Sequence, residues 1–329
     1  MLHISLSDKP QRTVPFYLAM EEFVACNIVA DECLFTWRVE PSVILGRNQL
    51  IDTEVDTHYC HANTIKIYRR KSGGGCVYAD LSNLMISYVT KQDNVALTYN
   101  RYTSLITAAL MNLGIMAEAN GRNDIMVDGK KVSGNAFYHH KGRSIVHGTL
   151  LYDTNMEHMT KAITPNNIKL ESKGVKSIRQ HITLLKDHTK LSLPEIERHI
   201  IETLCKERIE LQPNDIDAIE RIAQSYTSHE FLYGNNPTFC KKKTFRIDNV
   251  GEFCIKIDIR NNIIRKVNMT GDFFVLKDDK EELLSPFQGI TLSAEEIKRI
   301  VPEAPETVIA NLSRETFTKM LMETALCQP

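Results

Sequence analysis

Alternating apolar and polar positions predict strands on both sides of a glycine-rich segment. Residues 64–68 alternate with a period of two, and residues 83–89 form a second apolar run typical of a strand. The same signal predicts strands at residues 34–38, 42–46 and 146–151. Asp128-Gly129, between two short apolar runs, predicts a tight hairpin. We therefore expect antiparallel hairpins in the first two-thirds of the chain.

Helical periodicity lies between these strands. The pattern predicts one helix over residues 14–27, with Pro15 in its first turn, and another over residues 102–113. Ser192 and Glu195 form a capping box that predicts a third helix. Helices and hairpins mixed in this way predict an α+β fold with largely antiparallel sheets and flanking helices.

The C-terminal part of the chain has its own pattern. Turn residues interrupt the chain near residue 234, and residues 253–259 then alternate strictly before further helical segments. At this length a large domain followed by a small one is expected. We place the domains at residues 1–240 and 241–329, the second a small α+β unit.

Charge, the N-terminal segment and the cysteines argue against several classes of function. The 329 residues include 40 Lys and Arg against 41 Asp and Glu, which gives no field favouring nucleic acid or an anionic membrane. Residues 1–8 lack a signal-peptide pattern, and no apolar run reaches a membrane span. The eight cysteines form no Cys-x-x-Cys pair, as expected for reduced thiols. We expect a cytoplasmic protein with no nucleic-acid or membrane partner.

The glycine-rich segment is the first candidate binding site. Arg70, Ser72, Gly73, Gly74 and Gly75 combine a fixed cation with a backbone that can approach a ligand closely. Successive N–H groups in such a segment can form a nest for phosphate. The alternative is a hairpin turn in which the glycines supply geometry alone.

A lysine-bearing strand is the second candidate. Lys131 follows the Asp128-Gly129 turn and precedes the small residues Ser133 and Gly134, and a lysine on a rigid strand can stabilise growing negative charge. The spacing does not fit a Walker A loop. Alternatively, Lys130 and Lys131 are a solvated pair. His147 is equally open to a structural explanation, as a strand histidine that only makes hydrogen bonds.

A basic segment over residues 169–179 is the third candidate. Its four cations predict either a solvated loop or a lid over a polyanion, because Lys and Arg make strong charge-assisted hydrogen bonds.

Taken in order, these stretches resemble the lipoate-protein ligases. That family has the motifs Arg-Arg-x-Ser-Gly-Gly-Gly-x-Val-x-His-Asp, Asn-Asp, Lys-Val-Ser-Gly, His-Gly-Thr-Leu-Leu and Lys-Gly-x-x-Ser-Val-Arg. The matching positions here are 69–80, 123–124, 131–134, 147–151 and 173–179. One position departs from the family: Ala79 stands where the family has histidine, which removes any role of that imidazole.

The resemblance implies a biotin/lipoate ligase-like catalytic domain at residues 1–240 and an accessory domain at 241–329. It implies ATP and Mg²⁺ as substrate and cofactor, lipoyl-AMP as intermediate, and transfer of the lipoyl group to a lysine. The implied acceptors are apo lipoyl domains of 2-oxoacid dehydrogenase E2 subunits and the glycine cleavage H protein, and the implied state is a monomer. Alternatives are a lipoyl or octanoyl transferase that uses a preformed activated donor, and a catalytically silent adenylate-binding protein. Related octanoyl- and lipoyl-transferases use a cysteine nucleophile, so the resemblance also suggests a thioester on Cys76. A small residue within the glycine-rich segment is the simpler interpretation of this cysteine.

The resemblance also implies residue roles. Lys131 would be catalytic, contacting the lipoate carboxyl oxygen and the α-phosphate, and Asp124 would help to hold Mg²⁺. The implied ATP and lipoyl-AMP contacts are Arg70, Ser72, Gly73, Gly74, Gly75, Cys76, Val77, Tyr78, Asn123, Asp124, Lys131, Ser133, Gly134, His147, Gly148, Thr149, Lys173, Gly174, Ser177 and Arg179. The last four would form a loop that closes over the adenylate and keeps it from water.

Overall fold

The structure is a computed structural model that describes residues 1–7, 11–49, 51–120, 123–163, 181–233, 241–260, 263–277 and 281–326. The chain divides into two compact units. The first unit contains Met1–Leu45, Ile51–Arg70 and Cys76–Leu232, and the second contains Gly46–Leu50, Lys71–Gly75 and Tyr233–Pro329. Two short segments from the N-terminal half therefore belong to the same unit as the C-terminal part of the chain.

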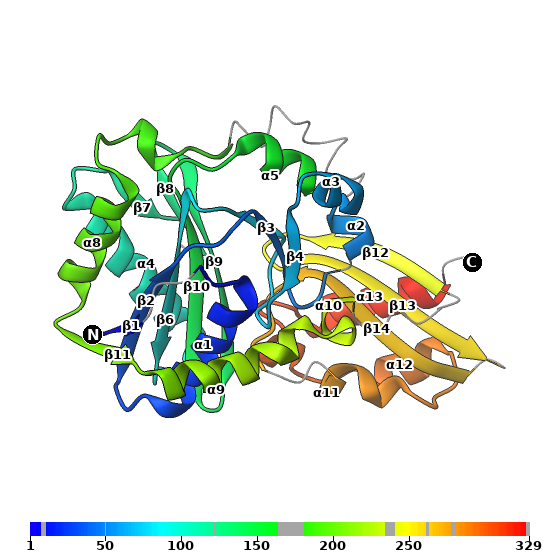
Figure 1. The fold of residues 1–329 in the computed structure, drawn as a ribbon. Coiled ribbons are helices and arrows are strands. Elements are labelled where there is room, and N and C mark those ends of the chain that lie inside the picture. Colours follow the sequence, from blue (N-terminus) through cyan, green and yellow to red (C-terminus); the bar gives the residue numbers. More distant parts are fainter. Residues whose placement is uncertain are drawn as a thin grey trace. The chain divides into compact units, whose positions relative to one another are not determined.

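The first unit is built on an eight-stranded sheet with the order β11-β1-β2-β6-β10-β9-β8-β7 (Figure 1). The strands of this unit are β1 (Leu2–Leu6), β2 (Glu32–Trp37), β3 (Ser42–Leu45), β4 (Lys66–Arg69), β5 (Val77–Ala79), β6 (Asn83–Thr90), β7 (Ala117–Ala119), β8 (Asp124–Val127), β9 (Lys130–His140), β10 (Arg143–Leu151) and β11 (Glu207–Leu211). In the large sheet β1 pairs in parallel with β2 and β11, and the remaining neighbours are antiparallel. The predicted α+β class is confirmed.

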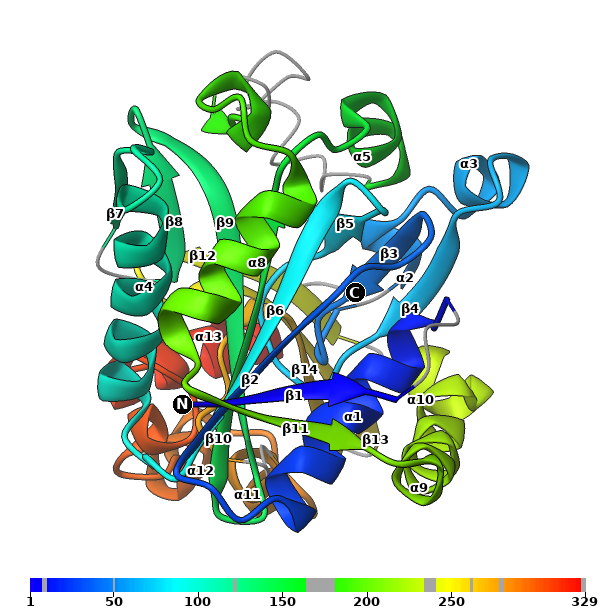
Figure 2. The same cartoon turned by 60° about the vertical axis from the view of Figure 1, so that its left-hand side comes forward.

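Helices cover both faces of this sheet. The helical segments are α1 (Val14–Asn27), α2 (Ile51–Glu54), α3 (Thr57–Ala62), α4 (Val95–Met111), α5 (Met156–Ala162), η1 (Leu185–Asp187), α8 (Leu193–Leu204), α9 (Pro213–Ala223), η2 (Gln224–Thr227) and α10 (His229–Tyr233). α1 and α9 pack on one face, and α4 and α8 pack on the other (Figure 2). α4 begins before the expected residue 102, because Asn94 accepts a hydrogen bond from the Leu97 amide and caps the helix there.

A three-stranded sheet in the first unit leads the chain into and out of the glycine-rich segment. β3 lies in the middle of this sheet, parallel to β4 and antiparallel to β5. β4 and β5 flank the segment but do not pair with each other. The glycines are therefore not the turn of a hairpin, and that part of the alternative is wrong.

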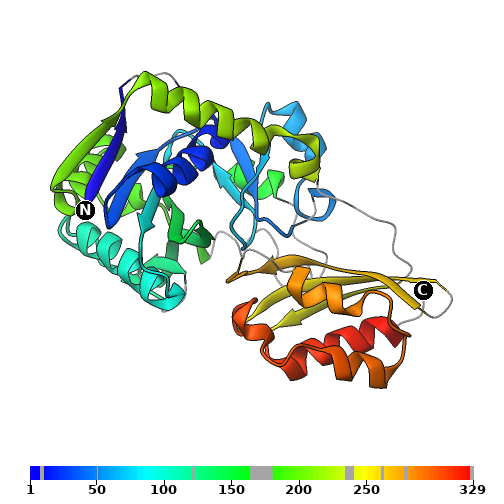
Figure 3. The same cartoon turned by 90° about the horizontal axis from the view of Figure 1, so that it is seen from below.

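The second unit is a smaller α+β body (Figure 3). Its elements are β12 (Lys241–Ile247), β13 (Gly251–Arg260), β14 (Ile263–Phe273), α11 (Glu281–Leu284), η3 (Ser285–Phe287), α12 (Ala294–Ile300), η4 (Pro305–Thr307) and α13 (Arg314–Leu326). The strands form an antiparallel sheet whose residues Phe253, Ile255 and Ile257 are buried against the helices. Within the described ranges of the chain, no helix is long and apolar enough to cross a membrane.

Candidate active site

The predicted lysine and the predicted acid lie together on adjacent strands. Lys131, on β9, places its Nζ 2.7 Å from Oδ1 of Asp124, on β8, and the two side chains remain 37% and 21% exposed. A partly exposed cation on a rigid strand is accessible to an anionic ligand. Lys130 is exposed, as the solvated alternative expects, whereas Lys131 makes the ion pair with Asp124.

A β-bulge aims Lys131 toward this acid. Ile125 pairs with Ser133, whereas its neighbour Met126 pairs with Lys131, so Val132 is an extra residue in β9. Side chains alternate between the faces of a sheet, and one extra residue turns the preceding side chain to the other face. The bulge therefore puts Lys131 on the opposite face from Ser133.

Gly134 makes room for the ammonium group. It pairs with Asp124 across the two strands, and a Cβ at Gly134 would lie 2.8 Å from both Cε and Nζ of Lys131. Contacts that short do not occur for real Cβ atoms, so any side chain here would displace the lysine. The Lys131 carbonyl also accepts a hydrogen bond from the Thr183 amide at 3.0 Å. Both the backbone and the side chain of Lys131 are thus held in place.

Two asparagines join the start of β8 to the middle of β9. Asn123 Nδ2 donates to the Asn135 carbonyl at 3.0 Å, and Asn135 Nδ2 donates to the Asn123 carbonyl at 2.7 Å. Ser133 Oγ donates to Asn135 Oδ1 at 3.2 Å. The sequence analysis did not select Asn135. Its signal was its position directly after Ser133 and Gly134, in the stretch that also contains Lys131.

His147 belongs to a buried polar network. Its Nδ1 lies 2.9 Å from Oε1 of Glu21, on α1, and Ser87 Oγ and Tyr138 Oη donate to the same carboxylate at 2.6 and 3.0 Å. Glu21 is fully buried, and a buried carboxylate requires such partners. These bonds hold the His147 ring through its Nδ1. Glu21 could have been suspected as an acid in the middle of an apolar helix.

The end of β4 carries two buried arginines. Arg70 donates from Nη1 to the Ile44 carbonyl at 3.0 Å, and Arg69 donates from Nε to the Leu232 carbonyl at 2.9 Å. Burial lowers the pKa of Arg69 to about 10, and the neighbouring cation of Arg70 adds to that shift. Arg69 therefore stays charged at neutral pH. The two arginines together concentrate positive charge at the start of the glycine-rich segment.

Cys76 is a poor nucleophile in this setting. Burial raises the pKa of its thiol above the ordinary value, and the Glu54 carboxylate adds to the shift. The thiolate is the reactive form, so this environment disfavours it. The structure therefore favours a packing role for Cys76 over the thioester alternative.

The glycines themselves lie in the second unit, where main chain approaches main chain. Gly74 N donates to the Phe273 carbonyl, on β14, at 3.3 Å. A Cβ at Gly73 would overlap that carbonyl oxygen, and a Cβ at Gly75 would lie 3.0 Å from Oδ2 of Asp272. Gly73 therefore permits close approach to a strand of the protein, which the sequence analysis did not anticipate.

The remaining predicted residues divide into three groups. In the first unit, Gly148 and Thr149 lie on β10 opposite Asn135 and Gly134, and Val77 and Tyr78 lie on β5. Ser72 belongs to the second unit, where its carbonyl accepts a hydrogen bond from the Arg47 amide at 2.8 Å. The segment with Lys173, Gly174, Ser177 and Arg179 lies outside the described residues.

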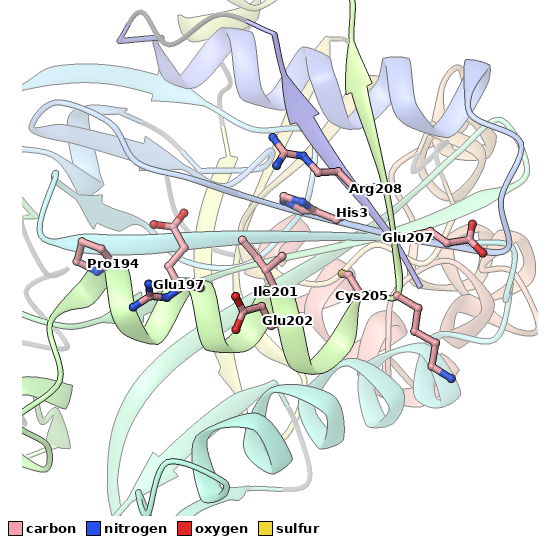
Figure 4. Close-up of a pocket in the computed structure, with 10 residues that line it drawn as sticks. His3, Pro194, Glu197, Ile201, Glu202, Cys205, Glu207 and Arg208 are labelled. Atoms are coloured by element: carbon pink, nitrogen blue, oxygen red, sulfur yellow. The ribbon is translucent and has the colours of Figure 1, made fainter.

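A surface pocket of about 470 Å³ opens elsewhere in the first unit, between α8 and the β1–β11 pair (Figure 4). His3, Glu197, Ile201, Cys205 and Arg208 are among its lining residues. It contains none of the residues selected from the sequence and carries charges of both signs. The surroundings of the Lys131–Asp124 ion pair, called the Lys131–Asp124 corner below, are therefore the better candidate active site.

β8 and β9 present an accessible lysine fixed beside an acid, and a fixed cation of this kind can stabilise negative charge on a reacting group. Residues 14–205 match the family model of the lipoyl protein ligase A/B catalytic domain, and residues 236–321 match that of the bacterial lipoate protein ligase C-terminus. The chain therefore belongs to the lipoate-protein ligase family.

Relatives match over most of their length. Lipoate-protein ligase LplJ of Bacillus subtilis is 30% identical over 321 residues, which cover 92% of this chain and 95% of the relative. Lipoate–protein ligase 1 of Staphylococcus aureus is 35% identical over 270 residues, which cover 79% of this chain and 82% of the relative. These matches confirm the predicted ATP-dependent ligase and support it over the alternative transferase.

Solved structures agree on the fold. P. falciparum LipL1, in complex with lipoate, superposes with a TM-score of 0.77 at 20% identity over 98% of both chains. A lipoate-protein ligase A bound with ATP gives a TM-score of 0.61 at 24% identity over 70% of this chain and 98% of its own. Both neighbours share the mixed α+β architecture described above.

Proposed function

We propose that Lys131 carries the charge-stabilising role in a two-step ligation. In the first step the lipoate carboxylate attacks the α-phosphorus of ATP, pyrophosphate leaves, and lipoyl-AMP forms. In the second step a lysine amine attacks the carbonyl carbon and AMP leaves. The observation that carries this assignment is the Lys131 ammonium, partly exposed and held 2.7 Å from Asp124 on a rigid strand.

We assign the substrate contacts to the residues of the matched motifs. Arg70 supplies fixed positive charge for the phosphates. The proposed binding residues, of which the glycines act through their main-chain groups, are Arg70, Ser72, Gly73, Gly74, Gly75, Cys76, Val77, Tyr78, Asn123, Asp124, Ser133, Gly134, His147, Gly148 and Thr149. Lys173, Gly174, Ser177 and Arg179 complete the set.

Mg²⁺ fits the donor set at the same corner. Mg²⁺ is held by one or two carboxylates together with phosphate oxygens and water. Asp124 supplies a partly exposed carboxylate, and the neighbouring Asn123 supplies an amide oxygen. These two residues would hold the ion, which would neutralise phosphate charge. Lys131 and Arg70 then balance the charge that remains.

We further propose that residues 1–240 act as the catalytic domain and residues 241–329 as the accessory domain. The proposed acceptors are the lipoyl domains of 2-oxoacid dehydrogenase E2 subunits and the glycine cleavage H protein. A monomer in the cytoplasm suits these acceptors, and the absence of a membrane-crossing helix among the described residues is compatible with that location.

The test measures the two steps separately. Purified protein with lipoate, ATP and Mg²⁺ should release pyrophosphate, and addition of an apo lipoyl domain should give a product heavier by one lipoyl group. Omission of ATP, or chelation of Mg²⁺ with EDTA, should stop pyrophosphate release. Transfer that proceeds equally well without ATP from an acylated carrier protein would contradict the proposal.

A further inference from the structure

Asn135 differs from the other residues of the candidate site because its side chain spans three strands. It is 4% exposed. On one side its Nδ2 donates to the Asn123 carbonyl at 2.7 Å, and on the other its Oδ1 occupies the space above Gly148 of β10. A Cβ at Gly148 would overlap that oxygen. The absence of a side chain at Gly148 is thus what admits the Asn135 amide.

The amide lies behind the reacting face. Side chains alternate along β9, and Asn135 shares its face with Ser133, whereas Lys131 has been turned to the other face by the bulge at Val132. The hydroxyl of Tyr102, on α4, lies 3.1 Å from the position of a Cβ at Gly148. Asn135 therefore acts from the α4 side of the sheet and does not face the Lys131 ammonium.

The hydrogen bonds of Asn135 fix the strand that carries the acid. The Asn123 carbonyl accepts from both the backbone N and the Nδ2 of Asn135, at 3.0 and 2.7 Å, and Asn123 Nδ2 returns a bond to the Asn135 carbonyl. Asn123 leads directly into Asp124, whose Oδ1 pairs with Lys131 Nζ. A shift of Asn123 therefore moves the acid and, through the ion pair, the lysine.

We propose that Asn135 is a positioning residue for adenylate formation, acting through Asn123 on the Asp124–Lys131 pair, and that Gly148 is required to admit its side chain. The proposal rests on the proposed function. Displacement of a catalytic group by about 1 Å can cost about 10²-fold in rate. Asn135 contacts no substrate in this scheme, so its loss should change kcat rather than the affinity for lipoate.

The test is a double-variant cycle at positions 135 and 148. Asn135→Ala should lower kcat for pyrophosphate release by about 10- to 100-fold and leave KM for lipoate within about twofold. Gly148→Ala should lower kcat by a similar factor in the wild-type background. In the Asn135→Ala background the same change should add less than about twofold, because Asn135 Oδ1 is gone and only the Tyr102 hydroxyl needs to shift slightly.

Thermal unfolding of all four proteins accompanies the kinetics, which are measured well below the lowest Tm so that every protein is folded. Asn135→Ala with kcat within twofold of an active wild type, or with a rise in KM for lipoate as its main effect, would overturn the positioning role. If Gly148→Ala lowers kcat and Tm equally in both backgrounds, Gly148 is not required to admit the Asn135 side chain, and that part of the proposal is overturned. A wild-type chain that releases no pyrophosphate would instead overturn the proposed function.

Discussion

In the first unit Gly134 leaves space for the Lys131 ammonium, whereas in the second unit Gly73 leaves space for the Phe273 carbonyl. The first neighbour is the far end of a flexible side chain, and the second is main chain within a paired strand. A flexible neighbour can move when a methyl group is added, so the protein stays folded but the charge is misplaced. A main-chain neighbour moves only with its strand. The same substitution should therefore affect activity in one region and stability in the other.

The largest effect is expected at the charge itself. Lys131→Ala should lower the rate of adenylate formation by about 10²- to 10³-fold, because a fixed charge aimed at the reacting group is lost. Its ion pair is partly exposed and should contribute less than about 1 kcal/mol to stability. Pyrophosphate release and urea unfolding measure the two quantities. Lys130→Ala is the matched control, since this exposed neighbour should keep wild-type activity, and equal losses in both variants would remove Lys131 from the mechanism.

Gly134→Ala tests the first half of the comparison. The added methyl group should push Lys131 Nζ away from its position, and the rate of adenylate formation should fall by about 10- to 100-fold. The free energy of unfolding should change by less than about 1 kcal/mol, since alanine suits a strand better than glycine does. Steady-state kinetics measure the rate of adenylate formation, and urea unfolding of the same preparation measures the free energy of unfolding. A variant that is destabilised but fully active when folded would reverse the argument.

Gly73→Ala tests the second half. Its methyl group would overlap the Phe273 carbonyl and lie 3.2 Å from Cα of Phe274, so the segment or the strand must shift. Overpacking of this kind costs about 1–3 kcal/mol. Gly75→Ala is the control in the same segment, because its neighbour is the Asp272 carboxylate, which can rotate away. Chemical unfolding should give Gly73→Ala a clearly lower free energy of unfolding than Gly75→Ala. Equal values would show that the segment does not depend on this close approach.

Local signals explain which parts of the fold the sequence predicted. Ser192 and Glu195 form the expected capping box at the start of α8. Asp128 and Gly129 both have positive φ, at 51° and 70°, as a tight hairpin requires. Each feature depends on residues within four positions of each other, and such signals are readable without knowledge of the tertiary structure.

Long-range pairing explains what the sequence could not predict. The bulge at Val132 exists only relative to the register of β8, and the overlap between Asn135 and Gly148 exists only once β9 and β10 are paired. The ordered motifs identified Lys131 and the glycines as functional. They gave no sign that residues 71–75 pack with β14 in the second unit, because that contact joins positions about 200 residues apart.

The smallest effect is expected from His3, a change in how stability depends on pH, and it serves as a reference for the effects at the two glycine regions. His3, on β1, lies opposite Arg208 of β11, and in the large sheet β2, β6 and β10 separate β1 from β9. Burial lowers the pKa of His3 below its ordinary value of 6.5, and the Arg208 cation adds to that shift. The folded protein therefore favours neutral His3, whereas the unfolded chain takes up a proton once the pH falls below about 6.5.

It follows that the contribution of His3 to stability is complete above its unfolded pKa and is lost as the pH falls toward the folded pKa. The free energy of unfolding should decrease slightly as the pH is lowered from about 7 to about 5, and His3→Gln should make that dependence shallower. Urea unfolding at three pH values measures the slope. The adenylation rate of His3→Gln near neutral pH should equal that of the wild type, since His3 has no part in the Lys131–Asp124 corner. If the free energy of unfolding of His3→Gln depends on pH as steeply as that of the wild type, other groups cause the pH dependence. If His3→Gln lowers the adenylation rate, activity responds to substitutions far from the Lys131–Asp124 pair, and the effects at Lys131 and Gly134 are not local.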